Sequence, residues 1–121
     1  MTSTRVLGRK WEQAAESFLE RQGLVTLDRN FQVRAGEIDL VMLDGQTLVF
    51  VEVRYRGNDR HGSGAASVTP AKQKRIAAAA GLFLQYHGRH RFRPCRFDVV
   101  SISRRGRKPL MDWIRAAFDA A

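Results

Sequence analysis

The sequence contains a single cysteine, Cys95, among its 121 residues. One cysteine cannot form a disulfide within the chain or build a cysteine-based zinc site, so both features are excluded. We expect Cys95 to behave as a small buried apolar residue. The sequence also lacks any run of roughly 20 apolar residues, the length that a membrane-spanning helix needs.

The first residues, 1–8, are polar and basic and lack the apolar central region of a secretory signal. We expect this stretch to be flexible and the protein to be cytoplasmic. A chain of 121 residues with an apolar fraction of 44% fits one domain with one packed core. The expected organisation is therefore a single domain over residues 1–121.

Acidic residues are scarce relative to basic ones. The chain has 21 Lys and Arg against 12 Asp and Glu, a formal net charge of +9. This excess favours a polyanionic partner, because basic side chains that neutralise phosphates release condensed counterions. The alternative is a charged surface that only keeps the protein soluble. Since the sequence has no strongly amphipathic basic helix with an aromatic apolar face, we expect a nucleic acid rather than a membrane as the partner.

Hydrophobic periodicity predicts a helix near each end of the chain. Residues 9–22 carry an apolar stripe at helical spacing, with Glu16 and Glu20 on the solvent side. Gly23 follows and is suited to the left-handed turn that ends a helix. Near the other end, residues 110–118 predict a short terminal helix.

A third helix is predicted in the second half of the chain. Thr69 is a suitable N-cap and Pro70 suits the first helical position, so we expect a helix from there to about Tyr86. The residues before it, 55–68, contain three glycines and several charges, which is typical of a polar loop. The residues after it, 89–94, form a basic connector.

Strands are predicted at residues 25–33, 38–43, 47–54 and 96–103. The two central strands are rich in β-branched and apolar residues and flank the dipeptide Asp44-Gly45, which tolerates the positive φ angles of a tight hairpin turn. Asp98 in the last strand is expected to pair with an arginine. The order of helices and strands predicts an α/β fold, a mixed sheet flanked by helices.

The predicted hairpin gathers charged side chains on one face of the sheet. With a two-residue loop at 44–45, Asp39 pairs with Phe50 and Glu37 pairs with Glu52. Because strand side chains alternate with a period of two, four charged side chains project from the same face, namely Glu37, Asp39, Glu52 and Arg54. Asp39 and Glu52 are then diagonal neighbours about 7–8 Å apart at the backbone, close enough for their carboxylates to converge.

A divalent cation suits this arrangement, because neighbouring carboxylates repel each other unless a cation lies among them. Mg²⁺ takes oxygen ligands from one or two carboxylates and leaves its other positions to water and phosphate. The candidate metal ligands are Asp39, Glu52 and the backbone carbonyl of Val53. The alternative is a solvated outer face on which Glu52 and Arg54 form an ordinary ion pair, and spacing alone does not separate the two.

The residues of this hairpin resemble a known family. The stretches Gly-Glu-Ile-Asp-Leu-Val at 36–41 and Val-Phe-Val-Glu-Val-Arg at 49–54 are similar to those of the bacterial YraN family of uncharacterised proteins, and the resemblance extends from about Trp11 to Asp98. That family is similar to archaeal Holliday junction resolvases and belongs to the restriction-endonuclease-like superfamily. The resemblance implies that fold, a Mg²⁺ or Mn²⁺ cofactor, hydrolysis of DNA with branched DNA as one candidate substrate, and a homodimer.

The resemblance also implies roles for individual residues. Asp39 matches the metal-binding aspartate of the superfamily, and Glu52 matches the acid two residues before its basic residue. Glu12 matches an extra acid of resolvase-like members, although a surface glutamate is the alternative. Arg54 stands where the family pattern usually has lysine. Because arginine stays protonated, it can stabilise a phosphate but cannot act as a base.

Further basic and polar residues complete the hypothesis. Lys72 precedes Ile76 by four residues on the inner line of its helix and lies near the helix N-terminus, so we expect it close to the sheet, where it partly compensates for Arg54. The alternative is that its alkyl stem only covers apolar surface. The residues expected to contact a nucleic-acid backbone are Arg56, Arg60, Gln73 and Arg75.

Three functions remain open from the sequence. The first is a Mg²⁺-dependent endonuclease whose catalytic residues are Glu12, Asp39, Glu52, Arg54 and Lys72. The second is a DNA-binding module whose catalysis is impaired because arginine replaces lysine. The third is a structural or adaptor protein whose acidic face only pairs charges internally.

Overall fold

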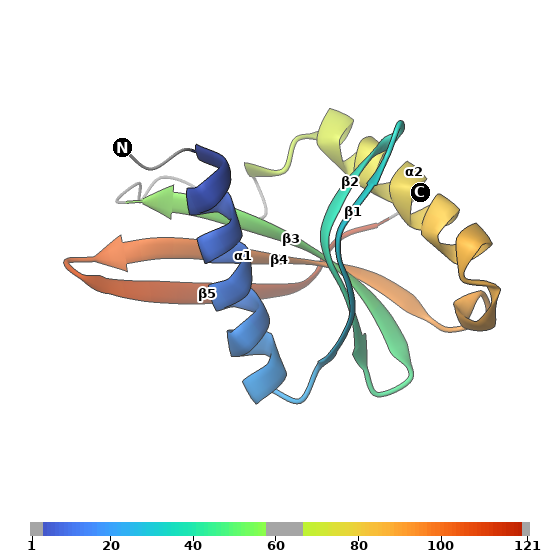
Figure 1. The fold of residues 1–121 in the computed structure, drawn as a ribbon, viewed down its shortest axis with the longest axis horizontal. Helices are drawn as coiled ribbons and strands as arrows, with labels where there is room; N and C mark the ends of the chain where they lie inside the picture. The colour runs from blue at the N-terminus through green and yellow to red at the C-terminus, as the bar shows by residue number, and fades with distance from the viewer. Residues whose placement is uncertain (1–3, 58–66, 120–121) are drawn as a thin grey trace.

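A computed structural model of the chain describes residues 4–57 and 67–119 (Figure 1). In this part of the chain, five strands form one sheet in the order β1-β2-β3-β4-β5. Neighbouring strands are antiparallel except β3 and β4, which are parallel. The strands are β1 (Val25–Val33), β2 (Gly36–Asp44), β3 (Thr47–Gly57), β4 (Cys95–Arg105) and β5 (Lys108–Phe118).

Helices cover both faces of the sheet, so the predicted mixed α/β architecture is confirmed. The helix α1 (Thr4–Arg21) crosses one face, and α2 (Pro70–Tyr86) packs on the other beside β1 and β2 (Figure 1). The connection that contains α2 joins the parallel strands β3 and β4, which a short turn cannot join. A 3₁₀ turn, η2 (Gly88–His90), follows α2. In the described ranges, neither α-helix is long and apolar enough to cross a bilayer.

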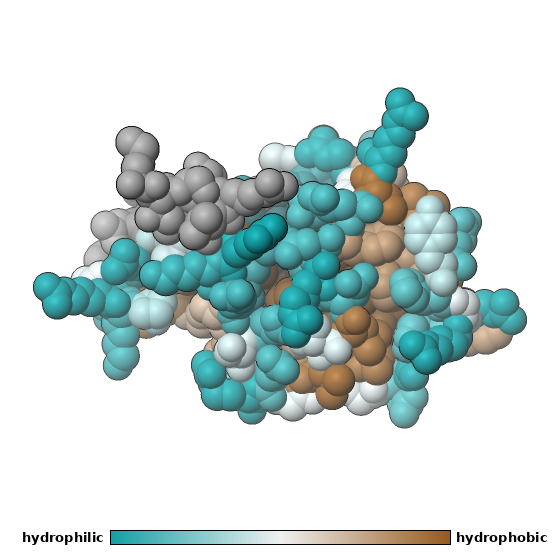
Figure 2. Space-filling model, in the orientation of Figure 1, coloured by the Kyte–Doolittle hydropathy of each residue, from teal (hydrophilic) through white to brown (hydrophobic). Residues whose placement is uncertain are grey.

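The core has two layers because alternate residues of the central strands point to opposite faces. The layer under α2 includes Val41, Leu48, Phe50, Phe83 and Phe97. The layer under α1 includes Ala15, Leu19, Met42, Val51 and Val100. In Figure 2, hydrophilic side chains cover the α1 side of the view, whereas hydrophobic side chains are visible over the β1–β2 hairpin and α2.

The start of α2 matches the expectation from sequence. The Thr69 side chain accepts a hydrogen bond from the Lys72 N–H at 3.2 Å, and Pro70 occupies the first turn. The first helix is longer than predicted, because α1 begins at Thr4 instead of residue 9 and so includes part of the stretch that we expected to be flexible.

The terminal helix predicted at 110–118 is wrong, because these residues belong to the strand β5. Its residues pair with β4. The strand is irregular at Ala116 (φ 49°), and the backbone N–H of Ala116 donates to Asp98 Oδ1 at 2.9 Å. The fully buried Asp98 also accepts from Trp113 Nε1 and, as predicted, from an arginine, Arg96. A short apolar segment suits either structure, and pairing with β4 decided this one.

Two predicted burial states are also wrong. Glu16, expected on the solvent side, is buried against β1, where it accepts hydrogen bonds from Thr26 Oγ1 at 2.6 Å and Arg29 Nε at 2.9 Å. Cys95, expected to be buried, is exposed at the start of β4. In both cases the neighbours that decide burial come from other elements.

The predicted hairpin register is shifted by two residues. Asp44 pairs with Thr47 and Val41 pairs with Phe50, so the loop consists of Gly45 and Gln46, with Gly45 at φ 60°. A shift of two would leave every side chain on its predicted face if the strand alternated regularly. In β2 it does not, because Ile38 packs in the layer under α2 and Leu40 in the layer under α1. The prediction that Glu37 shares a face with Glu52 is therefore wrong: Glu37 lines a cavity with residues of α1, while Glu52 bonds to Lys72 of α2.

Gly36 determines how closely α2 approaches the hairpin of β1 and β2. A Cβ atom at this position would lie 2.5 Å from the carbonyl oxygen of Arg75. Any side chain at residue 36 would therefore push α2 and its first-turn residue Lys72 away from the sheet.

We predict that Gly36→Ala lowers the free energy of unfolding by about 1–3 kcal/mol, the usual cost of overpacking a filled site. Gly81→Ala is the matched control, since its new methyl group meets no atom within 4 Å in the exposed middle of α2. That variant should be more stable by about 0.5–1 kcal/mol. Urea unfolding of both variants checks this, and equal effects of the same sign would contradict it.

Candidate functional site

The strands β2 and β3 separate at the candidate site. Their backbone pairing ends at Leu40 and Val51, after which β2 remains paired with β1 and β3 remains paired with β4 (Figure 1). Just past this point, the N–H of Val53 donates to Asp39 Oδ2 at 2.8 Å. The Asp39 carboxylate therefore lies in the opening of this fork, where it bonds to the backbone of the opposite strand.

Asp39 and Glu52 are the next residues of the two strands beyond their last pair. The two side chains are buried, with residue exposures of 9% and 6%. Burial raises the pKa of Asp39 well above its usual range, and the nearby charge of Glu52 raises it further, while the N–H of Val53 lowers it. By the observed register, Asp39 and Glu52 are opposite positions and not the diagonal neighbours that were predicted. That their carboxylates converge stays a prediction.

Glu12, a residue of α1, lies beside Asp39. Its carboxylate is hydrogen-bonded to Asp39 and to Asn30, and burial raises its pKa. Glu12 is thus partly buried beside Asp39 and Asn30 and is not an isolated surface glutamate.

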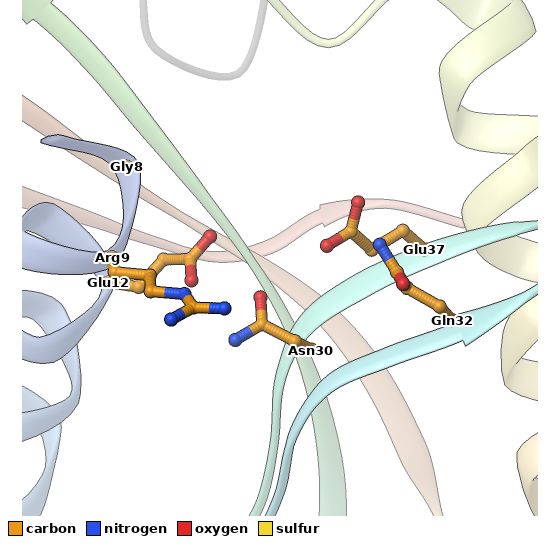
Figure 3. Close-up of a pocket in the computed structure, with 6 residues that line it drawn as sticks. All are labelled: Gly8, Arg9, Glu12, Asn30, Gln32 and Glu37. Atoms are coloured by element: carbon orange, nitrogen blue, oxygen red, sulfur yellow. The ribbon is translucent and has the colours of Figure 1, made fainter. Parts of the chain in front are cut away.

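A cavity of about 290 Å³ opens beside this acidic group. Figure 3 shows Glu12 on α1 facing Asn30 and Glu37 on the β1–β2 hairpin across this space. The lining residues are Gly8, Arg9, Glu12, Asn30, Gln32 and Glu37. The exposed Glu37 adds a negative charge that raises the pKa of Glu12, Asp39 and Glu52.

Two cations approach Glu52 from different elements. Lys72 Nζ in the first turn of α2 lies 3.0 Å from Glu52 Oε1, and Arg54 Nη1 on β3 lies 4.0 Å from the same oxygen. Burial raises the pKa of Glu52, and Lys72 and then Arg54 oppose that rise. The expected position of Lys72 near the sheet is confirmed. Because Glu52 is buried and its closer partner is Lys72, the alternative of an ordinary solvated pair with Arg54 is wrong.

The residues expected to contact a nucleic-acid backbone are spread around the site. Arg60 lies outside the described residues. Gln73 donates from Nε2 to the carbonyl of Val68 at 3.0 Å, so it closes the start of α2. Arg75 is exposed on α2, and Arg56 is partly buried in β3.

Asn30, Gln32 and Arg9 were not among the residues selected from sequence. Asn30 adopts φ 52°, a backbone conformation that asparagine tolerates better than most residues. An asparagine within an otherwise regular strand pattern was the available signal for such a position. Nothing in the sequence pattern indicated that it would lie beside Glu12.

The donor set fits an open magnesium site. Across residues 4–57 and 67–119, no group of three or more His, Cys, Asp or Glu side chains is arranged to hold a metal ion. The available donors are the carboxylates of Asp39 and Glu52 and the carbonyl of Val53. Mg²⁺ commonly binds through one or two carboxylates and keeps several waters. A cation would also relieve the repulsion that raises the pKa of both acids.

The sheet order and the fork define the class of this protein: it has a restriction-endonuclease-like α/β fold, with a five-stranded mixed sheet between two helices and acidic residues where β2 and β3 separate. Within that class, the chain belongs to the uncharacterised protein family UPF0102, whose family model matches residues 11–102. This is the YraN family, so the resemblance drawn from the hairpin is confirmed.

Relatives in this family match almost the whole chain. A protein of Stutzerimonas stutzeri is 48% identical over 120 residues, which cover 99% of this chain and 100% of the relative. A protein of Ectopseudomonas mendocina is 51% identical over the same length and coverage. One of Xanthomonas oryzae pv. oryzae is 53% identical over 109 residues, or 90% of this chain and 88% of the relative. Each is called a UPF0102 protein, a name that states no activity.

The raised pKa of Asp39 predicts how stability depends on pH without divalent metal. The folded state binds this proton more tightly than the unfolded state, so the stabilisation is complete below about pH 4 and is lost as the pH rises through the folded pKa. Each pKa unit of elevation corresponds to about 1.4 kcal/mol.

Asp39→Asn should therefore be more stable than the wild type at pH 8 but not at pH 4, because asparagine still accepts from Val53 and never ionises. Urea unfolding in EDTA from pH 4 to 8.5 measures this. Asp119→Asn, an exposed position after β5, is the control and should follow the wild type. Identical pH profiles for Asp39→Asn and the wild type would contradict the assignment.

Proposed function

We propose that this chain is a metal-dependent endonuclease that hydrolyses phosphodiester bonds in DNA. The observation that carries the proposal is the buried pair Asp39 and Glu52 at the fork, with Lys72 at 3.0 Å from Glu52. Burying two adjacent carboxylates costs free energy unless a cation compensates them. Strongly perturbed carboxyl pKa values beside a cavity are typical of functional sites.

In this proposal, Asp39, Glu52 and the Val53 carbonyl hold Mg²⁺ or Mn²⁺. The ion supplies charge stabilisation for the phosphate and lowers the pKa of water in its shell. Glu12 on α1 lies beside Asp39, where it would help to position the carboxylate that holds the ion. Glu12 thereby supports the site without needing to be a ligand.

Lys72 and Arg54 stabilise the phosphate that is cleaved. Both approach the same oxygen of Glu52, so both lie beside the proposed ion. Lys72 also belongs to the first turn of α2, where the positive end of the helix dipole favours a phosphate. An ammonium group from α2 thus supplies the compact charge that the family pattern usually places at residue 54.

The net charge of +9 supports DNA as the substrate. A polyanion approaching Glu12, Glu37, Asp39 and Glu52 is repelled by them, and the basic surplus over the rest of the chain offsets this repulsion. A divalent cation between the acids and the phosphate removes the remaining conflict. The same surplus supports binding even when no bond is cleaved.

A DNA-binding module with impaired catalysis is the second candidate, and Arg54 is the observation that favours it. Arginine in the position of the usual lysine cannot take a proton from water. In this case Lys72 remains paired with Glu52, and the site only binds phosphate.

The first test is nicking of branched, single-stranded and duplex DNA by the purified protein with Mg²⁺ or Mn²⁺. We expect the wild type and Asp119→Asn to cleave at equal rates and Asp39→Asn to show no cleavage. Cleavage that persists in Asp39→Asn would point to a contaminant. Binding that weakens steeply with salt but leads to no cleavage would favour the impaired module, and absence of binding would favour an adaptor.

The second test compares two neighbouring lysines. Lys72→Gln should lower the cleavage rate about 10²–10³-fold, the usual loss when one stabilising group is removed from a reacting oxyanion. Lys74→Gln, an exposed position two residues later, should change it less than about threefold if its only role is to add charge. Equal losses in both variants would contradict a specific role for Lys72. Arg54→Lys should retain or increase cleavage.

A further inference from the structure

One long segment of the chain carries basic residues and no acidic ones, a distribution that the acidic site does not explain. The segment 69–97 contains seven Lys and Arg and no Asp or Glu, so all 12 acidic residues lie elsewhere. This segment comprises α2, η2 and the connector to β4. It therefore forms a continuous stretch without negative charge that begins beside Glu52.

The exposed side of α2 leads away from the site. Lys74 and Arg75 are exposed near its start, and farther along the exposed ridge carries the small residues Ala78 and Gly81. From Lys72 to Tyr86 the helix rises about 21 Å, the length of about six nucleotides stacked at 3.4 Å. Figure 1 shows α2 running from beside the fork to the far end of the molecule, where η2 follows.

The connector at that far end is held firmly. Arg93 donates from Nε to His90 Nδ1 at 2.9 Å and from Nη1 to Gln46 Oε1 at 2.8 Å. The carbonyl of Pro94 accepts from the N–H of Leu48 at 2.8 Å. The connector is thus hydrogen-bonded both to the β2–β3 turn, through Gln46, and to the start of β3, through Leu48.

This well-anchored connector presents an apolar ring to solvent. Phe92 is 87% exposed, more than any other large hydrophobic residue in the described part of the chain. The guanidinium carbon of Arg91 lies 4.8 Å from the centre of the Phe92 ring, and Arg89 is also exposed. A single ring among arginines offers little apolar area to a protein partner, whereas it matches the flat face and nearby phosphate of a nucleotide.

We propose that Phe92 stacks on an unpaired base of a DNA strand whose phosphates follow the exposed side of α2 to the acidic site. This inference rests on the proposed function, since it assumes a nucleic-acid ligand. Aromatic rings stack on any base face, and arginine adds attraction to the phosphate and the ring. The proposal defines the substrate as DNA with a single-stranded part about six nucleotides from the cleaved bond.

The test measures binding in EDTA, where cleavage is suppressed, by fluorescence anisotropy with two labelled DNAs. One is a blunt duplex, and the other is the same duplex with a single-stranded extension. We expect Phe92→Ala to weaken binding of the extended DNA roughly 5- to 100-fold and to leave the blunt duplex unchanged. Phe92→Trp should restore it, and Leu110→Ala, an exposed apolar control on β5, should have no effect.

Salt dependence separates the ring from the charges. Arg89→Gln and Arg91→Gln should each reduce the salt dependence of binding to both DNAs, because each removes one phosphate contact. Phe92→Ala should leave the salt slope unchanged. Since Phe92 is exposed, its variant should melt at the wild-type temperature.

The inference is overturned if Phe92→Ala binds the extended DNA as tightly as the wild type does. In that case nicking that depends on Asp39 still supports the proposed function, so the two failures are distinct. If the wild type binds neither DNA, both proposals fail together, and a protein or lipid surface becomes the expected partner of Phe92.

Discussion

The structure depends on one carboxylate that accepts a backbone hydrogen bond where two strands no longer pair. Where β2 leaves β3, the N–H of Val53 bonds to the side chain of Asp39 at 2.8 Å. The backbone N–H at the fork is thus paired with an ionisable group, Asp39, and a second ionisable residue, Glu52, is buried at the next position of the other strand. Burial and the charge of Glu52 both raise the pKa of Asp39, and a cation beside the two carboxylates would oppose that rise.

The helix α1 spans the fork because it is attached on both sides of it. Glu16 bonds to Thr26 and Arg29 on β1. The Trp11 ring stacks on Tyr55 of β3, with ring centres 4.3 Å apart and planes 8° from parallel. Glu12 lies between these two attachments and so meets Asp39. On the opposite face, the close contact at Gly36 and the Thr69 cap place the first turn of α2 so that Lys72 reaches Glu52.

An acidic site within a basic protein makes sense when the ligand is itself an anion. Four carboxylates around the fork would repel a phosphate, while the remaining surface attracts it. In the proposed function, a divalent cation would resolve this conflict at one point only and so would confine the reaction to the fork. The acid-free segment that begins at α2 extends the attractive surface away from that point, so charge alone orients a long polyanion relative to the site.

The sequence by itself determined the strands of the central hairpin and the start of α2 at Thr69 and Pro70. These features depend on residues close in the chain, since a cap needs only its own first turn. The common face predicted for the charged residues failed at Glu37, because β2 does not alternate regularly between Ile38 and Leu40. Only the tertiary structure decided the partner of each side chain. Glu16 is buried because β1 lies beside it, and the terminal segment is a strand because β4 pairs with it. Asp39 lies near Glu12 because β2 and β3 separate under α1. Such contacts join residues far apart in the chain, and local periodicity carries no information about them.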